Sequence, residues 1–234
     1  MKHDMNLIAS PIMDYKHIEF EQVVFHLNQI NGNKQKRFWL QKAYEYIETT
    51  IRPVYSLDEF QPASLTMQKK RGSCSQRLAC LETLARAHRI PTRVRGLWIQ
   101  GEFWYPRFAL TKHFIPKKIL LAWPQFYLED EKFWMDVDEL FMTTQEMTSQ
   151  SKLGFTNEGE TLFDALKHMP IDFLGKSKKC VGLCGPANFD LSKFVLSEEG
   201  FFNTRDELFM KFYDLNLSWR GKAFKIFYGD RKSS

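Results

Sequence analysis

The feature that most constrains this chain is a helix start at Ser73 and a matching helix stop at Ile90-Pro91. Ser73 and Gln76 have the spacing of a capping box, in which each side chain satisfies a backbone N–H that the first helical turn leaves unpaired. Pro91 ends the helix because its ring disfavours helical geometry at the preceding residue. Cys74 is therefore predicted to be the first helical residue, at the positive end of the helix dipole. The residues expected on the buried face are Leu78, Leu81, Leu84, Ala85 and His88.

Beyond Pro91 the hydrophobic residues alternate along the chain, which is typical of strands. Strands are predicted over residues 92–99, 102–108, 119–128 and 132–137. The first two are expected to form a hairpin that turns at Gln100-Gly101. Pro124 has no N–H to donate to a sheet, so it predicts a bulge or an edge position in the third strand.

Further helices are predicted over residues 17–30, 35–51, 161–168 and 203–215, with polar loops over 56–71 and 144–160. Helices followed by a run of strands favour an α+β fold, here with the helix from Cys74 packed on an antiparallel sheet. We expect one domain over residues 1–234. Its core would span about 43–141, with an N-terminal helical part (1–42) and a C-terminal extension (142–234).

The composition is that of a globular protein, with 44% hydrophobic and 26% charged residues among 234. No segment approaches the roughly 20 apolar residues of a membrane helix, and the N-terminus lacks the apolar core of a signal peptide. We therefore expect a cytoplasmic protein without membrane contact. The net charge of +5 shows no basic stripe, so nucleic-acid binding is not expected. Basic clusters at Lys112–Lys118 and Lys176–Lys179 fit either solvated loops or a surface for an acidic partner protein.

The four cysteines do not suggest a disulfide framework or a metal site. Cys180 and Cys184 could supply two zinc ligands, whereas a structural zinc site needs four. We expect reduced thiols, no metal and no cofactor.

Cys74 is the candidate for chemistry. A helix N-terminus can lower the pKa of a thiol below its free value of about 8.5, and the first-turn N–H groups can stabilise an oxyanion. The alternative is a buried structural cysteine, which behaves as a small hydrophobic residue.

Two blocks of the sequence resemble the transglutaminase-like superfamily. Gly72-Ser73-Cys74, the helix and the segment Ile90–Gly96 are similar to its Gly-x-Cys, apolar helix and Gly-Ile-Pro-Ala-Arg pattern. Leu121–Leu128 and Phe133–Asp138 are similar to its second block, His-Ala-Trp-x-Glu-x-Tyr followed by Trp-x-x-x-Asp. The resemblance covers about residues 43–141 and implies a papain-like fold, of the kind found in stand-alone bacterial members.

In that family a Cys attacks an acyl carbon, a His shuttles the proton and an Asp orients the His. The resemblance places Cys74 in the nucleophile slot, Asp138 in the Asp slot and Leu121 in the His slot. Leucine cannot transfer a proton, so the triad is incomplete. Asp136 lies two residues before Asp138 and would share its strand face, so only the family spacing favours Asp138.

Other residues could complete the site. His113, in a loop before Leu121, is a candidate base or else a surface histidine, whereas His88 would lie about 21 Å along the helix from Cys74. Gln68 could donate to an oxyanion, as a Gln does in papain-like enzymes, or be a solvated loop residue. The residues expected to line an apolar substrate cleft are Trp98, Trp104 and Trp123.

Two functions follow from these residues. One is acyl transfer, or hydrolysis of an amide or thioester, by Cys74 with a degenerate triad. Its substrate would be a peptide, an amide or a carrier-bound acyl group. The other is a catalytically inactive member that acts as a binding or scaffolding module.

Overall fold

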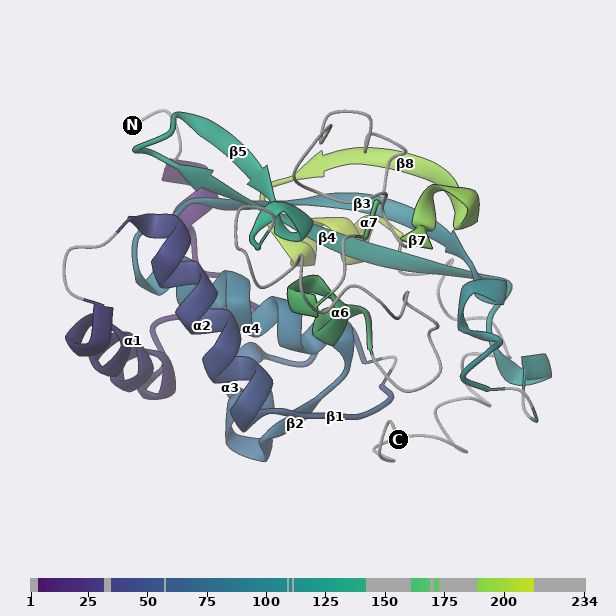
Figure 1. Ribbon diagram of the computed structural model, residues 1–234, viewed down its shortest axis with the longest axis horizontal. Coiled ribbons are helices and arrows are strands. Elements are labelled where there is room, and N and C mark those ends of the chain that lie inside the picture. The colour runs from purple at the N-terminus through teal and green to yellow at the C-terminus, as the bar shows by residue number, and fades with distance from the viewer. Residues whose placement is uncertain are drawn as a thin grey trace.

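A four-stranded antiparallel sheet lies at the centre of the fold (Figure 1). The strands lie in the order β5 (Phe133–Asp136), β4 (Lys118–Leu128), β3 (Thr92–Gln100) and β8 (Val195–Phe202). The structure is a computed structural model that describes residues 4–31, 35–56, 58–108, 110, 112–141, 161–168, 171–172 and 189–212. This mixture of helices and antiparallel sheet confirms the predicted α+β fold.

The helices pack against this sheet or against one another, and the longest of them gather on one side in Figure 1. They are α1 (Ile18–Asn31), α2 (Lys36–Thr50), α3 (Ala63–Lys69), α4 (Cys74–Ala87), α6 (Leu162–His168) and α7 (Arg205–Lys211). Helix α4 is central, because it contacts α1, α2, α3 and α6 as well as strands β3 and β4.

Short elements connect these parts. They are the 3-10 helices η1 (Asp4–Leu7), η2 (Gly101–Trp104), η3 (Lys112–Phe114), η4 (Val137–Glu139) and η6 (Leu191–Phe194), and the parallel strand pairs β1 (Arg52–Pro53) with β2 (Arg71–Gly72) and β6 (Ile171–Asp172) with β7 (Phe189–Asp190). The β1–β2 pair brings the chain after α2 back beside the start of α4.

The helix predictions are mostly confirmed. Helices α1, α2 and α6 lie within a residue or two of the predicted ranges. The loop predicted over 56–71 was wrong in part, because its second half contains α3. The predicted helix over 203–215 begins as expected, with the Thr204 side chain accepting from the Glu207 N–H at 3.1 Å. Its last residues, the polar loop 144–160 and both Cys180 and Cys184 lie outside the described residues.

The predicted strand over residues 102–108 was wrong. Strand β3 pairs directly with β4, and the register closes at Gln100 opposite Lys118. Residues 101–117 form an excursion between the two strands instead, with η2 and η3 in it. The two ends of this segment lie close together at Gly101, whose N–H donates to the Lys117 carbonyl at 2.8 Å. A Cβ at Gly101 would lie 2.0 Å from the Pro116 carbonyl oxygen, so this close approach requires glycine.

Pro124 lies in β4 without a bulge, opposite Val94 of β3. The pairing with β5 begins only at Gln125, so among the described residues β4 has a single neighbour at Pro124. The missing N–H is tolerated at such a strand position.

Helix α4 is buried on all sides, which its sequence pattern did not predict. Every residue from Gln76 to Arg86 is buried, including the charged side chains of Arg77, Glu82 and Arg86. Glu82 forms an ion pair with Arg205 of α7, with 2.5 Å between Oε1 and Nε, and both side chains are at most 1% exposed. Segments far apart in sequence are thus joined at the helix.

Arg86 and Arg205 also bind backbone groups. Arg86 donates to the Thr92 hydroxyl at 2.7 Å, and to the carbonyls of Ile8 and Asn203. Arg205 donates to the Ala122 carbonyl of β4 at 3.2 Å. These bonds tie α4 to the sheet, to the N-terminal segment and to the chain before α7.

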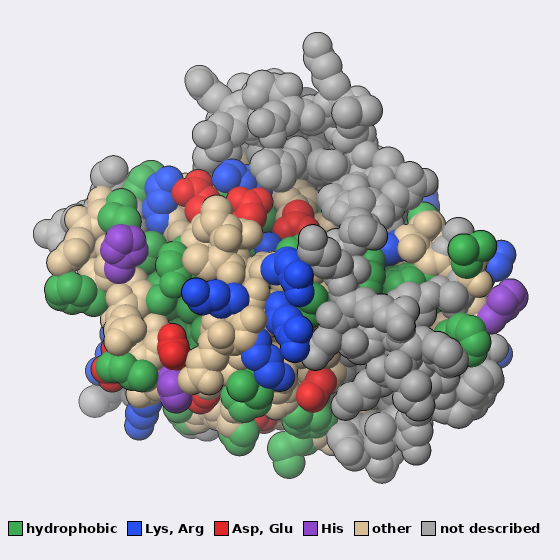
Figure 2. Space-filling view, turned by 90° about the horizontal axis from the view of Figure 1, so that it is seen from below, with side chains coloured by type: hydrophobic (Ala, Val, Ile, Leu, Met, Phe, Trp, Pro, Cys, Tyr) green, Lys and Arg blue, Asp and Glu red, His purple; other side chains and the backbone are tan. Residues whose placement is uncertain are grey.

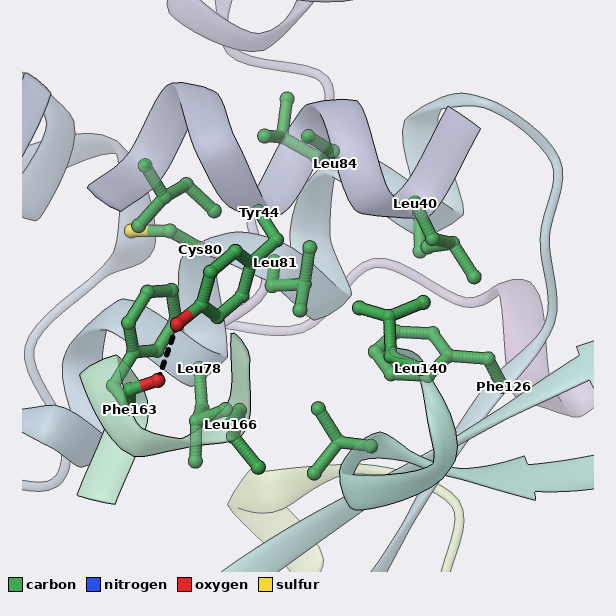
Figure 3. Packing of buried hydrophobic residues seen from close by; sticks show 14 of the residues in the cluster. Leu40, Tyr44, Leu78, Cys80, Leu81, Leu84, Phe126, Leu140, Phe163 and Leu166 are labelled. Atoms are coloured by element: carbon green, nitrogen blue, oxygen red, sulfur yellow. Dashed lines mark hydrogen bonds between the residues drawn. The ribbon is translucent and has the colours of Figure 1, made fainter. Parts of the chain in front are cut away.

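The apolar core next to α4 is drawn in Figure 3. Tyr44 of α2 stacks on Phe163 of α6, with 4.4 Å between ring centroids, and its hydroxyl donates to the Phe163 carbonyl at 2.5 Å. Other labelled core residues in this view are Leu40, Leu78, Cys80, Leu81, Leu84, Phe126, Leu140 and Leu166. This packing holds α6 against α2 and α4.

The surface seen from below the helices mixes all side-chain types. Figure 2 shows Lys and Arg side chains near the middle of this face, with hydrophobic side chains scattered among polar ones. Among the described residues, no helix is both long and apolar enough to cross a membrane.

We predict that Glu82→Leu lowers the free energy of unfolding by about 3–5 kcal/mol, because it leaves the Arg205 charge buried without its partner. The double variant Glu82→Leu/Arg205→Leu should lose clearly less. Chemical denaturation of the three proteins measures this. Glu129→Ala is the control, since it removes an ion pair to Lys36 in which Glu129 is 76% exposed, and it should change stability little. A double variant as unstable as the single one would contradict the prediction.

Candidate functional site

Cys74 is the first residue of α4, as the sequence predicted. The Ser73 hydroxyl accepts from the Gln76 N–H at 3.2 Å, and the Gln76 side chain accepts from the Ser73 N–H at 2.9 Å, which confirms the capping box. The Gln76 amide also donates to the Asp58 carbonyl at 2.9 Å. The cap therefore fixes both the start of the helix and the loop before it.

A cavity of about 100 Å³ lies beside Cys74. Its apolar wall includes Phe103, Trp104, Phe108, Ile115, Leu121 and Leu162. Its polar lining consists of Ser56, Glu59, Ser73, Ser75, Arg107 and Thr161. Leu121 and Cys74 thus border one space, and much of the opposite wall comes from the excursion over residues 101–117.

Burial raises the pKa of the Cys74 thiol to about 12, although the residue keeps some exposure to solvent. The charges of Arg77 and Arg205 and a hydrogen bond to the Phe163 backbone lower the pKa, while the carboxylate of Asp164 raises it. The expectation of a lowered pKa at the helix N-terminus was therefore wrong. Desolvation outweighs the positive charges around the sulfur.

Helix α6 brings the groups that surround Cys74 on one side. Arg77, fully buried one turn after Cys74, pairs with Asp164 at 2.6 Å and lies 4.1 Å from the Phe163 ring centroid. Thr161 and Leu162, at the start of α6, line the cavity. The sequence predicted this helix but gave no signal that it would cover the cysteine.

Asp138 lies in η4, directly after β5, and accepts a hydrogen bond from the Trp123 indole N–H at 3.3 Å. The pKa of Asp138 is raised to about 8, mainly by burial and also by the neighbouring charges of Asp136 and Glu139. Asp136 is used elsewhere, since it accepts from the Gln125 amide at 2.8 Å and lies 3.5 Å from Arg95. Asp138 is not among the described residues that line the cavity.

Residues 26–139 match the model of the transglutaminase-like superfamily. This segment is a transglutaminase-like core. The match includes the capped helix of Cys74, the β3–β4 pair and the β5–η4 segment that ends at Asp138 and Glu139.

One solved structure is similar in part. It is a candidate cysteine protease from Cytophaga hutchinsonii, with 14% sequence identity and a TM-score of 0.41. The similarity covers 58% of this chain and only 40% of that one. Among curated proteins, none matches the sequence.

Within the transglutaminase-like core, the two weaker candidates, His113 and Gln68, do not line the cavity beside Cys74. His113 is exposed in η3, although its neighbours Ile115 and Pro116 line the cavity. Gln68 is exposed near the end of α3 and does not line the cavity. His88 caps the far end of α4 and stacks on Trp39, with 4.1 Å between ring centroids. No His is among the described residues that line the cavity.

The three tryptophans have different positions. Trp104 lines the cavity. Trp123 is buried in the main core, where it binds Asp138. Trp98 pairs across the sheet with Leu120, whereas Leu97 pairs with Leu121, so Trp98 and Leu121 point to opposite faces. Trp98 packs in a second core cluster with Leu208 and does not line the cavity.

Three polar side chains at the site, Glu59, Ser75 and Arg205, were not found from the sequence. The Ser75 hydroxyl donates to Glu59 at 2.5 Å and accepts from Arg205 at 3.0 Å. Burial raises the pKa of Glu59, while the bond from Ser75 and the charge of Arg205 lower it. Glu59 lies in an irregular loop and Arg205 is about 130 residues further on than Ser75. No local spacing connects them.

In the described part of the chain, no three His, Cys, Asp or Glu side chains are grouped so that they could hold a metal ion.

We predict that Asp138 makes the protein less stable as the pH rises. Its folded pKa of about 8 lies above the ordinary value of 3.8, so the folded state binds the proton more tightly. The resulting stabilisation is complete below about pH 4 and is lost as the pH rises through about 8. Denaturation between about pH 5 and about pH 9 should show this fall in the wild type and a smaller one in Asp138→Asn. The exposed variant Glu129→Gln should behave as the wild type; an unchanged fall in Asp138→Asn would contradict the assignment.

Proposed function

We propose that this chain is a transglutaminase-like binding module, in which the cavity beside Cys74 receives an apolar group without Cys-His-Asp catalysis. The observation that carries the proposal is the position of Leu121. The family resemblance assigns it to the slot of the proton-shuttling His, and it borders the same cavity as Cys74. The change replaces a titratable group by an apolar wall at the point where proton transfer would occur.

The state of the thiol supports the same function. With a pKa of about 12, Cys74 is almost entirely protonated near neutral pH, and the thiolate is the reactive form. A cavity with aromatic and aliphatic walls and a few polar groups is the usual form of a binding site for a small apolar group.

Acyl transfer from a thioester by Cys74 is the second candidate. It is favoured by Arg77 and Arg205, whose charges lower the pKa of Cys74, and by Glu59, a carboxyl group in the same cavity. A thiolate leaving group needs less protonation than an amine, so loss of the His would impair thioester cleavage least.

Alkylation of Cys74 by iodoacetamide, followed by mass spectrometry of its peptide, separates the two functions. If the chain is a binding module, we expect Cys74 to be alkylated at least about tenfold more slowly than N-acetylcysteine near pH 7.5. The alkylation rate of Cys74 should then rise with pH, without a plateau, up to about pH 10. Cys80, which is fully buried and has a raised pKa, is an internal reference that should react no faster. Reaction of Cys74 as fast as the free thiol would overturn the proposal and favour acyl transfer.

Leu121→His adds a second test. An imidazole in this slot should lower the pKa of Cys74 and increase its alkylation rate near pH 7.5. Leu121→Asn is the matched control, because it is polar but does not titrate. If both variants accelerate alkylation equally, solvent entry and not the imidazole is the cause.

A further inference from the structure

The excursion over residues 101–117 contributes a cation to the otherwise mostly apolar cavity. Arg107 lines the cavity together with Phe103, Trp104 and Phe108 of the same segment. The segment is anchored at both ends, because Gln100 pairs with Lys118 and the Gly101 N–H binds the Lys117 carbonyl. The Arg107 side chain therefore extends from an anchored segment.

The surroundings of Arg107 orient its guanidinium. Its Cζ lies 5.8 Å from the ring centroid of Tyr55, which also lines the cavity, and its Nη2 atom is buried. Tyr55 in turn packs on Phe108, with 4.5 Å between ring centroids. The guanidinium is a planar group whose N–H donors match the geometry of a carboxylate.

The charges of the cavity favour an anion. Arg107 is the single Lys or Arg among the described lining residues, and Glu59 is the single Asp or Glu. Glu59 is engaged by the Ser75 hydroxyl, which itself accepts from Arg205, so a second cation lies close to the Glu59 carboxyl group and offsets its charge. The positive charge of Arg107 is thus the main fixed charge that a bound molecule would meet.

The volume of the cavity limits the size of the apolar group that a bound molecule can carry. An engineered apolar cavity of about 150 Å³ takes a benzene molecule, so a cavity of about 100 Å³ has room for about four carbon atoms. Leu121, Phe103 and Leu162 provide the surface against which such a group would pack.

We infer that the cavity binds a short aliphatic carboxylate, with the alkyl group against Leu121 and the carboxylate on the Arg107 guanidinium. This inference rests on the proposed binding function and names the class of molecule bound. The same chemistry occurs in a free short-chain acid and in the C-terminal residue of a peptide that ends in valine.

Isothermal titration calorimetry on the full chain tests the inference with 3-methylbutanoate and its neutral amide, 3-methylbutanamide. We expect the acid to bind at least about tenfold more tightly, because a charge-assisted hydrogen bond in a desolvated site is stronger than a neutral one. Arg107→Gln should remove this preference, and Arg107→Lys should retain part of it. Arg52→Gln, at an exposed arginine outside the cavity, is the matched control. Circular dichroism of each variant verifies folding.

The outcomes are distinct. Equal binding of acid and amide, or a preference that persists in Arg107→Gln, overturns the role of Arg107. Binding of neither compound overturns the ligand class. N-acetylvaline distinguishes the two sources, because binding of it as tight as that of 3-methylbutanoate supports a peptide terminus, and weaker binding supports the free acid.

Failure of this inference is separable from failure of the proposed function. Slow alkylation of Cys74 without binding of 3-methylbutanoate leaves the binding module standing and removes this ligand class. Fast alkylation of Cys74 together with tight binding of 3-methylbutanoate removes the proposed function and leaves the ligand class standing. Bound 3-methylbutanoate should also slow the alkylation of Cys74 at about pH 9 in the wild type but not in Arg107→Gln.

Discussion

The ion pair between Glu82 and Arg205 is the interaction on which the rest of the structure depends. It lies on helix α4, which is buried all round, and Arg205 also binds the Ser75 hydroxyl and the Ala122 carbonyl. A buried charge without a partner costs several kcal/mol, so α7 must dock for α4 to occupy the centre. Because Cys74 is the first residue of α4, docking of α7 also fixes the position of the sulfur.

The same burial decides the chemistry at Cys74. A helix N-terminus stabilises a nearby negative charge by about 0.3–1 kcal/mol, which is less than one pKa unit. Desolvation moves the thiol pKa from 9.0 to about 12, in the opposite direction and by more. A central helix packed on all sides thus gives its first residue a defined position and a raised thiol pKa. Leu121 reinforces this by excluding a titratable neighbour.

Short sequence patterns correctly predicted the helix ends and strands that depend on interactions between neighbouring residues. The capping box at Ser73, the helix end at Pro91 and the alternation in β3 and β4 placed Cys74 at a helix start beside a sheet, and the family resemblance added Leu121 to the same site. The predictions were wrong or incomplete where contacts between segments far apart in the sequence determine the structure. Residues 102–108 alternate like a strand, but β4 already occupies the neighbouring position of β3. Strand β8, which completes the sheet, was not identified from the sequence. Glu59 and Arg205 meet at Ser75 only in the folded chain.

The close approach at Gly101 distinguishes sequence changes within the segment 101–117 from changes in the paired strands β3 and β4. Since Gln100 and Lys118 close the sheet behind it, we expect that residues 102–115 can change in length or charge without disturbing the register of β3 and β4, whereas Gly101 must stay glycine. The part of the cavity lining that comes from residues 101–117 can thus vary while the sheet stays the same. Relatives that carry different residues in this interval would differ in what they recognise while retaining the same frame, and comparison of this interval alone would sort them by ligand.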